Sequence, residues 1–495
     1  MSTLLRNARL YDGARVDLLV EDGLVSWLSS EPKARVSKPA DEELDLDGRW
    51  VGPGLWDSHV HFGQWSLVSR RLDVSGTTSA AETAARVRDE VARHPPVPGT
   101  VLIGQGFRDG LWPDAPTPDL LEFGEVPVAL VSGDVHCMWS NAAALRLLGL
   151  PADAWLLREQ DAFDLNVRLS AVPDDQLDVW ALEAAATAAS RGVVGIVDLE
   201  MSGAIASWQR RFGAGFRGLR VRAGVYPDDL DAVAATGIRT GKEVPGTGGL
   251  LVGGPFKLFT DGSLNTRTAW CYDDYPGLSG PDAAGLAIHS ADELLGLARP
   301  AVARGFLPAI HAIGDRATTL ALDTFEALGP LPADLAPVGG SIEHAQLVAA
   351  ADLPRFAALG VRASVQPEHA MDDREVADHY WAGRTGRAFA YRALWEAGAE
   401  LALGSDAPVA PLDPWVTISA AVSRSRDGRE PWHPEQALPI AVALRASSDR
   451  VGDLVTGGRA DLVVTDLNPM EASGEQLRGM PVHATMVAGE WTFGP

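Results

Sequence analysis

The chain has 495 residues, enough for one large α/β barrel with extra parts or for about three domains of average size. It carries 42 basic and 66 acidic residues, so its formal net charge is −24. So acidic a chain, with no basic cluster, is not expected to bind nucleic acid or anionic lipid. Its apolar runs are far shorter than the roughly 20 residues that cross a bilayer, so no membrane partner is expected either.

The N-terminus and the cysteines indicate the expected compartment. Residues 1–10 lack the charged start, the long apolar stretch and the cleavage site of a secretory signal. Cys137 and Cys271 are the only cysteines, too few for a disulfide framework in a chain of this length. We therefore expect a cytoplasmic protein with reduced cysteines.

Short alternating strands are expected at both ends of the chain. They are residues 4–10, 16–21, 24–28 and 43–46 at the start, and 460–467 and 484–493 at the end. Neither end has enough apolar residues to bury a core alone. We therefore predict one small β-sandwich domain that residues 1–50 and 450–495 build together.

Between these ends, eight short β-branched or apolar runs alternate with stretches of helical character. The runs are residues 50–61, 193–201, 219–226, 255–261, 307–311, 340–344, 361–366 and 401–406, with helical stretches that include 176–191, 291–304, 318–328 and 387–398. Eight βα units close a (β/α)8 TIM barrel. We therefore predict an α/β fold with a barrel domain at residues 51–449.

The first two runs are much farther apart than a plain barrel requires. The segment between them contains Pro-rich turns, a strand-like run at 127–132 and an expected helix at 141–148. We interpret residues 62–173 as an insertion after barrel strand 1, a lid subdomain over the mouth of the barrel.

Side chains that could carry chemistry lie in or at the ends of the predicted strands, where a barrel places its reactive groups. They are His59 and His61 at the end of the first run, Lys257 in the fourth, His311 at the end of the fifth, His344 at the end of the sixth and Asp406 at the end of the eighth. Histidines at positions i and i+2 of a strand share a face, so His59 and His61 can hold one cation. Each residue alone has an ordinary explanation, such as a turn cap or a local ion pair. Their concentration at one end of one barrel favours a metal centre.

The same residues carry a resemblance to a known family. The motifs at residues 53–61, 133–136, 256–263, 310–317, 342–346, 366–369 and 404–408 resemble those of the amidohydrolase superfamily. The residues of these motifs are most similar to those of amidohydrolase family 3, which includes N-substituted formamide deformylase-like enzymes. The similarity extends over nearly the whole chain, as far as residues 458–464.

The resemblance implies a centre of one or two divalent metal ions, with Zn²⁺ as the expected metal. The implied ligands are His59, His61 and Asp406 for one ion and His311 and His344 for the second. In many relatives the lysine at the position of Lys257 is carboxylated and bridges the two ions, because an ammonium would repel them.

The resemblance also implies a metal-dependent hydrolase that cleaves a non-peptide C–N bond of amide or formamide type. Hydroxide activated by the metal would attack the carbonyl, while Asp406 acts first as general base and then as general acid. His344 and Lys257 are the other expected catalytic residues.

Five more side chains are candidates for contact with a small-molecule substrate. They are His136 and Trp139 in the insertion, Arg267 after the fourth run, and Gln366 and His369 at the end of the seventh. An ordinary role stays open for each of them, such as core packing for the tryptophan or a surface ion pair for the arginine. The sequence does not determine the substrate or the oligomeric state, although barrels of this kind are commonly homodimers.

Two alternatives stay open. One is a mononuclear deaminase or cyclic-amide hydrolase of the same superfamily; the deaminases usually carry a glutamate beside the histidine of strand five, where this chain reads His311-Ala312-Ile313. The other is a catalytically silent binding protein on the same fold, which would typically have lost the metal ligands that this chain retains. The number of bound metal ions would separate these alternatives.

Overall fold

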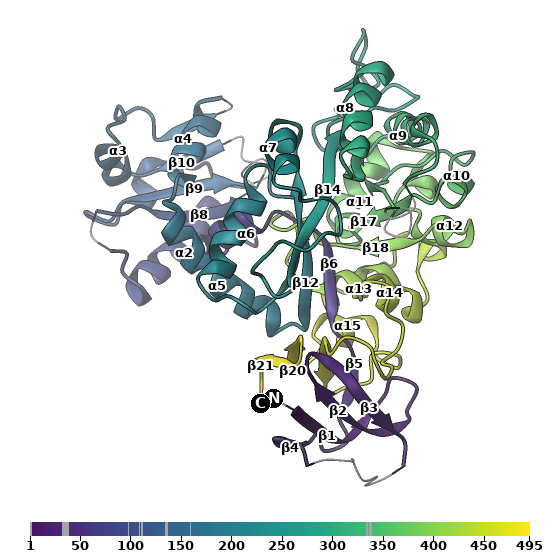
Figure 1. The fold of residues 1–495 in the computed structure, drawn as a ribbon. Helices are drawn as coiled ribbons and strands as arrows, with labels where there is room; N and C mark the ends of the chain where they lie inside the picture. Colours follow the sequence, from purple (N-terminus) through teal and green to yellow (C-terminus); the bar gives the residue numbers. More distant parts are fainter. Residues whose placement is uncertain are drawn as a thin grey trace. The chain divides into compact units, whose positions relative to one another are not determined.

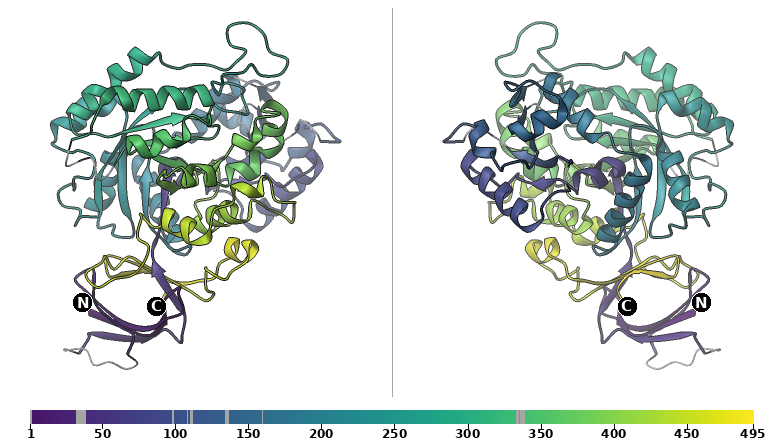
Figure 2. Two further views of the ribbon diagram at one scale, coloured as in Figure 1. Left: turned by 90° about the vertical axis from the view of Figure 1, so that its right-hand side faces the viewer. Right: turned by 90° about the vertical axis from the view of Figure 1, so that its left-hand side faces the viewer.

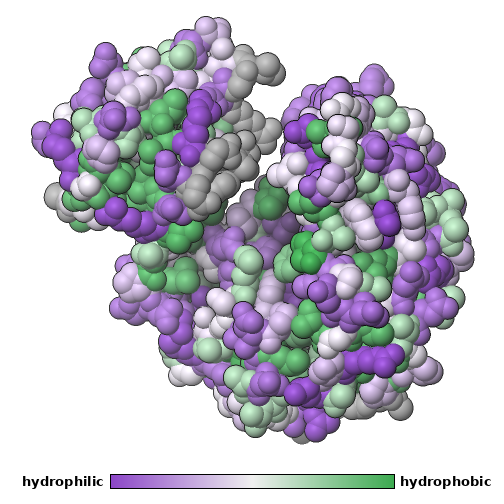
Figure 3. Space-filling view, turned by 90° about the horizontal axis from the view of Figure 1, so that it is seen from above, coloured by the Kyte–Doolittle hydropathy of each residue, from purple (hydrophilic) through white to green (hydrophobic). Residues whose placement is uncertain are grey.

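The computed structural model describes residues 2–31, 39–97, 99–107, 109, 112–133, 137–158, 160–332, 335 and 339–495. The chain forms two compact units, Met1–Phe62 with Ala185–Pro495, and Gly63–Ala184 (Figure 1). Within the described ranges, every helix is too short or too polar to span a lipid bilayer. Hydrophilic side chains are spread over the face seen in Figure 3, in keeping with the acidic composition.

The larger unit contains the predicted (β/α)8 barrel, whose parallel strands lie in the order β18-β17-β16-β15-β14-β13-β12-β6. The strands are β6 (Leu55–Val60), β12 (Val193–Asp198), β13 (Arg220–Val225), β14 (Leu251–Phe259), β15 (Pro308–Ala312), β16 (Ser341–His344), β17 (Arg362–Val365) and β18 (Leu401–Leu403). Most of their residues are buried, as expected for parallel strands covered on both faces. The expected fold class, a barrel with an added β-structure from the chain ends, is confirmed.

Helices follow the strands and surround the barrel (Figures 1 and 2). They are α6 (Ala204–Gly213), α7 (Leu230–Ala235), α8 (Ala291–Ala303), α9 (Asp315–Leu328), α10 (Leu353–Leu359), α11 (His369–Tyr380), α12 (Tyr391–Glu396), α13 (Pro414–Ser423) and α14 (Ile440–Ala446). Helix α8 begins with a capping box in which Ser290 and Glu293 each bond the other's backbone N–H. The helix expected at 387–398 is shorter, because a 3-10 turn at Thr385–Arg387 precedes α12.

The barrel closes between its first and last strands at their carboxyl ends. The Asp406 N–H donates to the His59 carbonyl at 2.7 Å, and the His61 N–H donates to the Ala407 carbonyl at 2.8 Å. Gly404 makes this approach possible, because a Cβ atom there would lie 2.7 Å from the His59 nitrogen. Barrel closure therefore brings Asp406 beside His59 of β6 and His61, which directly follows the strand.

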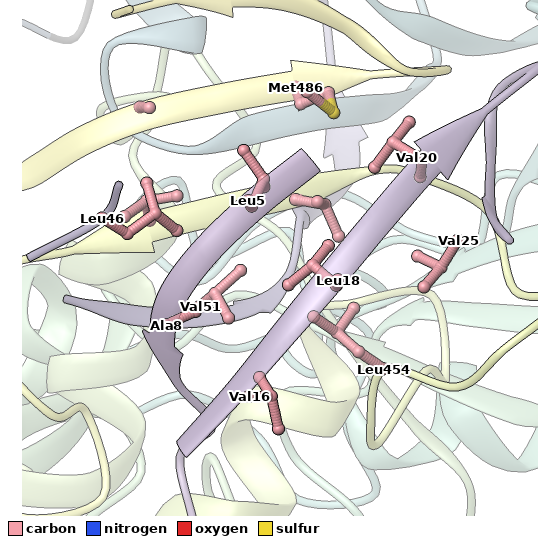
Figure 4. Close-up of a cluster of buried hydrophobic side chains, with 14 residues drawn as sticks. Leu5, Ala8, Val16, Leu18, Val20, Val25, Leu46, Val51, Leu454 and Met486 are labelled. Atoms are coloured by element: carbon pink, nitrogen blue, oxygen red, sulfur yellow. The ribbon is translucent and has the colours of Figure 1, made fainter. Parts of the chain in front are cut away.

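Strands from both chain ends form one sheet, in the order β21-β20-β19-β5-β1-β2-β3 with β4 paired to β1. They are β1 (Ser2–Arg9), β2 (Arg15–Glu21), β3 (Leu24–Ser29), β4 (Glu42–Asp45), β5 (Trp50–Pro53), β19 (Leu462–Thr465), β20 (Val482–Val487) and β21 (Glu490–Phe493), with helix α15 (Gly474–Arg478) between β19 and β20. Leu5, Leu18 and Val51 of the N-terminal part pack in one buried cluster with Leu454 and Met486 of the C-terminal part (Figure 4).

The first predicted run, residues 50–61, is two strands rather than one. Strand β5 pairs with β19 of the terminal sheet, and β6 pairs with β12 of the barrel. The strands meet at Gly54, where a Cβ atom would lie 2.2 Å from the side chain of Val194. One continuous apolar run thus crosses between two sheets, which residue type alone does not reveal.

The smaller unit has a sheet of its own, in the order β11-β10-β9-β8-β7. Its strands are β7 (Leu72–Asp73), β8 (Leu102–Phe107), β9 (Val128–Ser132), β10 (Cys137–Ser140) and β11 (Leu156–Arg158), and its helices are α1 (Phe62–Val68), α2 (Ala80–Arg93), α3 (Ala142–Leu148), α4 (Gln160–Ser170) and α5 (Asp174–Ala189). The expected helix at 141–148 is α3, which the Asn141 side chain caps by accepting from the Ala144 N–H at 2.9 Å. A lid function for this segment stays a prediction.

Candidate metal centre

The structure brings His59, His61 and Asp406 together at the closing edge of the barrel. The Nε2 atoms of His59 and His61 lie 3.4 and 3.3 Å from the same oxygen of Asp406, Oδ1. One ligand atom from each of the three residues lies within 4.8 Å of the other two. Two imidazole nitrogens and one carboxylate oxygen are a donor set that binds zinc-like ions.

Glu343 orients His59 toward this point. Its Oε2 atom accepts from His59 Nδ1 at 2.7 Å, and its Oε1 atom accepts from the Ser341 hydroxyl at 2.6 Å. Burial raises the pKa of Glu343, but the hydrogen bonds from His59 and Ser341 and the nearby charges of His59 and Lys257 together outweigh burial and lower the pKa below its usual value. An ionised carboxylate can only accept, so Nδ1 of His59 carries the proton and Nε2 is left as a donor for a metal.

A second pair of histidines lies next to the first. The rings of His311 and His344 are 4.5 Å apart between centroids, and the rings of His59 and His344 are 5.0 Å apart. Nε2 of His311 donates to the Gly262 carbonyl at 3.1 Å. The four predicted histidine ligands and Asp406 therefore do converge, whereas their assignment to two separate ions stays a prediction.

Lys257, on β14, is buried with 1% of its surface exposed, close enough to the cluster for its charge to act on His59 and His311. Its Nζ atom lies 5.2 Å from the centre of the Phe259 ring. Asp261, the carboxylate that could have paired with Lys257, instead accepts from the backbone of Trp270, Ile313 and Gly314. Burial lowers the pKa of Lys257, and the charges of Glu343 and Asp406 oppose that shift.

The protonation states fit the ligation of a cation. Burial and the charge of Lys257 lower the pKa of His59, and the same two causes lower the pKa of His311 to about 3. Burial and the neighbouring His311 hold the pKa of His344 well below its usual value. Burial raises the pKa of Asp406, but the histidines outweigh it and hold that pKa well below its usual range. Burial lowers the pKa of His61, but the hydrogen bond and charge of Asp406, with the charge of Glu200, outweigh burial and raise it. Neutral His59, His311 and His344 and an ionised Asp406 are the forms that bind a metal, and His61 would lose its proton on ligation.

Several buried polar atoms around the cluster have no hydrogen-bond partner among the described residues. They are Nδ1 of His61, Nδ1 of His344, Oε1 of Gln366 and Nε2 of His369. An unpaired buried polar atom costs about 1–3 kcal/mol, so several of them in one place indicate a group that completes their bonding. These residues therefore fit a bound cation and a polar substrate.

The backbone at the cluster is strained. His344, Ala345 and Asp406 have φ angles of 73°, 42° and 57°, in the left-handed region that residues other than glycine rarely adopt. Such conformations cost about 1–3 kcal/mol each and are found mainly at functional sites. The strain therefore supports a functional role for the ends of β16 and β18.

The predicted substrate-contacting residues fall into different surroundings. Gln366 and His369 reach the cluster, where Gln366 Nε2 lies 3.5 Å from Nδ1 of His59. Arg267 is half-buried in the loop after β14, with its guanidinium 5.6 Å from the centre of the Tyr380 ring. His136 lies outside the described residues.

The prediction for Trp139 is corrected. Trp139 is fully buried in the core of the smaller unit, and its indole N–H donates to the Thr117 carbonyl at 3.0 Å. The side chain therefore packs in that core and does not face a substrate.

Sequence reasoning missed two carboxylates that build the centre, Glu343 and Asp57. The Asp57 carboxylate accepts from the Ser405 N–H at 2.9 Å and from the His59 N–H at 3.1 Å, which ties β6 to the segment after β18. Burial raises the pKa of Asp57 to about 7. Both acids lie within two residues of a predicted ligand in a buried strand, and that position was the signal that could have identified them.

The fold and the cluster define a (β/α)8 barrel with a candidate metal centre at the carboxyl ends of its strands. The model of the amidohydrolase family matches residues 42–493, and the chain therefore belongs to this family. The resemblance to amidohydrolase family 3 is thereby confirmed.

Known proteins are similar over nearly the whole chain. Protein LONG AFTER FAR-RED 3 of Arabidopsis thaliana is 27% identical, over 91% of this chain and 83% of its own. N-substituted formamide deformylase of Arthrobacter pascens is 25% identical, over 95% of this chain and 94% of its own. The crystal structure of an uncharacterized metal-dependent hydrolase from Pyrococcus horikoshii superimposes with a TM-score of 0.79 at 26% identity, covering 96% of this chain and 99% of the other.

Proposed function

We propose that this chain is a metal-dependent hydrolase that cleaves a non-peptide C–N bond of amide or formamide type in a small molecule. The observation that carries the proposal is the convergence of His59, His61 and Asp406 in a buried site that favours an ionised Asp406 and a neutral His59. The deformylase among its relatives supports the bond type.

His59, His61 and Asp406 would hold a divalent ion, for which we propose Zn²⁺. A bound ion of this kind makes water a nucleophile near neutral pH and polarises the carbonyl group of a substrate. Asp406 accepts the proton released by the attacking water at a carboxylate oxygen. It then donates that proton to the leaving nitrogen, so that one residue serves as base and as acid.

Lys257 has a separate part in the proposal. Burial lowers the pKa of its ammonium, which favours the neutral amine. A neutral amine can add to carbon dioxide and lose a proton, which gives an anionic carbamate. We propose this carboxylation because a buried ammonium would repel a cation at the cluster.

A substitution at Asp406 tests the proposal. Asp406→Asn keeps the shape of the side chain and removes its basic oxygen, so turnover should fall by about 10²- to 10⁴-fold. The assay is hydrolysis of N-substituted formamides, N-acyl amino acids and cyclic amides by the zinc-loaded protein.

Asp449→Asn is the matched control. Asp449 is also a buried acid, but it pairs with Arg222 and Arg459 and does not touch the cluster. The control should keep its turnover. Near-normal turnover of Asp406→Asn, or no hydrolysis of any of the three substrate classes by the zinc-loaded wild-type protein, would contradict the proposed function.

A further inference from the structure

The smaller unit contains a cavity of about 460 Å³ whose lining is rich in arginine. Its walls come from residues 69–73, from one face of helix α2 and from the start of strand β8. Four guanidinium groups line it, those of Arg70, Arg71, Arg86 and Arg93. The chain has a net charge of −24 and no basic cluster in its sequence, so the fold itself gathers this positive charge.

Helix α2 presents three charged side chains to the cavity. Arg86, Glu90 and Arg93 are spaced at i, i+4 and i+7, which places them on one face of the helix. Glu90 is already engaged, because Arg93 lies 3.7 Å from one of its oxygens and His94 lies 3.0 Å from the other. Arg86 is exposed and forms no hydrogen bond or ion pair with any described residue. Its guanidinium is therefore free to bind a ligand.

Arg71 is a half-buried cation that only neutral groups hold in place. Its Nη1 atom donates to the side-chain oxygens of Gln105 and Asn166 at 2.6 and 3.0 Å, and its Nη2 atom donates to the Ser170 hydroxyl at 2.7 Å. Its Nε atom is buried and lacks a hydrogen-bond partner in the described part of the chain. Burial lowers the pKa of Arg71 to about 10, so the side chain stays charged at pH 7. A fixed guanidinium with no counter-ion favours the binding of an anion.

The carboxylates near the cavity leave this charge uncompensated. The Arg70 guanidinium pairs with Glu183 of α5, and Glu90 is engaged as described above. Asp73 lines the cavity too, but it forms no ion pair with a described residue, and its Oδ1 atom accepts from the Ser75 N–H at 2.8 Å. Arg71 and Arg86 are thus two cations without an acidic partner, beside a carboxylate whose second oxygen can accept from a hydroxyl group.

The size and the apolar part of the lining indicate an organic ligand. Leu72 and Leu102 are half-buried, and both line the cavity and pack against the hydrophobic core of the smaller unit. A volume of about 460 Å³ falls in the range of about 300–1,000 Å³ that is typical of small-molecule sites. An inorganic phosphate ion would leave most of this space empty.

We propose that this cavity binds a small organic phosphate that carries hydroxyl groups, as sugar phosphates and nucleotides do. Arg71 and Arg86 bind the phosphate oxygens, and Asp73 accepts from a ligand hydroxyl group. A phosphate monoester fits better than a carboxylate, because its three free oxygens can bond two guanidinium groups at once. The site goes beyond the proposed function, since every lining residue belongs to the smaller unit and the metal ligands belong to the larger one.

Calorimetric titration of the full chain with glucose 6-phosphate tests the inference. The wild-type protein should show saturable binding. Arg86→Gln removes an exposed side chain that bonds no described residue, so the variant should fold normally while its affinity falls by about 10- to 100-fold. Arg88→Gln is the matched control, because it removes the same charge from the same helix at an exposed position outside the cavity lining, 5.5 Å from the centre of the Phe123 ring. This control should keep the wild-type affinity.

Two further ligands define the chemistry of the site. Gluconate carries similar hydroxyl groups but a carboxylate in place of the phosphate, so it should bind at least about tenfold more weakly than glucose 6-phosphate. Adenosine 5′-monophosphate is the nucleotide arm, and the tighter of the two phosphates identifies the natural class. Hydrogen exchange locates the ligand, because bound phosphate should slow amide exchange in residues 69–73 and in α2.

Four results would overturn the inference. The first is the absence of saturable binding for both phosphates. The second is equal affinity in the wild type and Arg86→Gln, as expected for a phosphate that binds a metal ion instead. The third is an equal loss of affinity in Arg86→Gln and Arg88→Gln, which would indicate a general effect of charge. The fourth is gluconate binding as tight as that of glucose 6-phosphate, which would exclude a phosphate site.

Discussion

The hydrogen bond between Glu343 and His59 offers a quantitative test of how the metal centre is organised. In Glu343→Gln the amide keeps the geometry, because its carbonyl can accept from His59 and its N–H can donate to the Ser341 hydroxyl. Only the negative charge is lost. A hydrogen bond to a charged group contributes about 1.5–3 kcal/mol, and one between neutral groups contributes about 0.5–1.5 kcal/mol.

The difference of about 1–1.5 kcal/mol corresponds to about 5- to 10-fold weaker metal binding. Glu343→Ala removes the partner altogether and leaves Nδ1 of His59 unpaired in a buried site, so affinity should fall by about 100-fold. The ranking of the metal affinities, with the wild type tightest, the glutamine variant next and the alanine variant weakest, is therefore as informative as the individual values.

Calorimetric titration of the metal-free variants with Zn²⁺ measures these affinities, with Asp449→Asn as the control for loss of a buried acid remote from the site. Equal affinities for the wild type and both Glu343 variants would refute the reasoning. A glutamine variant as weak as the alanine variant would show that charge, and not orientation, is the contribution of Glu343.

Two further substitutions test barrel closure and a buried ion pair. Gly404→Ala places a Cβ atom 2.7 Å from the His59 nitrogen and should destabilise the fold by about 1–3 kcal/mol. The control Gly452→Ala has nothing within 4 Å of its Cβ and should leave the thermal midpoint unchanged. Equal thermal midpoints for the two variants would contradict a close approach of the strands at Gly404. Burial raises the pKa of Asp449, but Arg222 and Arg459 together outweigh burial and lower the pKa. This acid therefore stabilises the fold above its unfolded pKa of about 3.9 and loses that effect as pH falls through the folded pKa. The unfolding free energies of wild type and Asp449→Asn should therefore converge between about pH 5 and about pH 3 in urea titrations, and a constant difference would contradict the assignment.

The barrel could be predicted because each of its strands is a short buried run that ends in a recognisable polar cluster. Burial on both faces makes parallel strands read as continuous apolar segments, and this pattern located all eight strands of the barrel. The passage from β5 to β6 was not predictable in this way, because both strands are apolar and only the close contact at Gly54 separates them. In the smaller unit only β9 was expected, as the run at 127–132, because the other strands, of two to six residues, gave too little periodicity to be recognised.

The convergence of the candidate ligands was predictable for the same reason, since the carboxyl ends of parallel strands meet at one end of a barrel. What the sequence could not give is the direction in which each side chain points. The sequence does not say that Glu343 faces His59, or that one oxygen of Asp406 faces both His59 and His61, because both depend on backbone angles at the strand ends. Trp139 shows the same limit, since its place in the insertion does not say that its ring turns into the core of the smaller unit.

The sheet shared by the two chain ends has a consequence for the order of folding on the ribosome. Strand β5 pairs with β19, with Trp50 opposite Thr465. Trp50 therefore cannot pair with its partner strand until most of the chain between the two residues has been translated. Until then the first strands present an open edge and half of an apolar core to the cell. The barrel can close earlier, whereas its N-terminal strands stay vulnerable to aggregation until the last residues have left the exit tunnel. A stop codon that removes β19 to β21 would leave that edge exposed permanently.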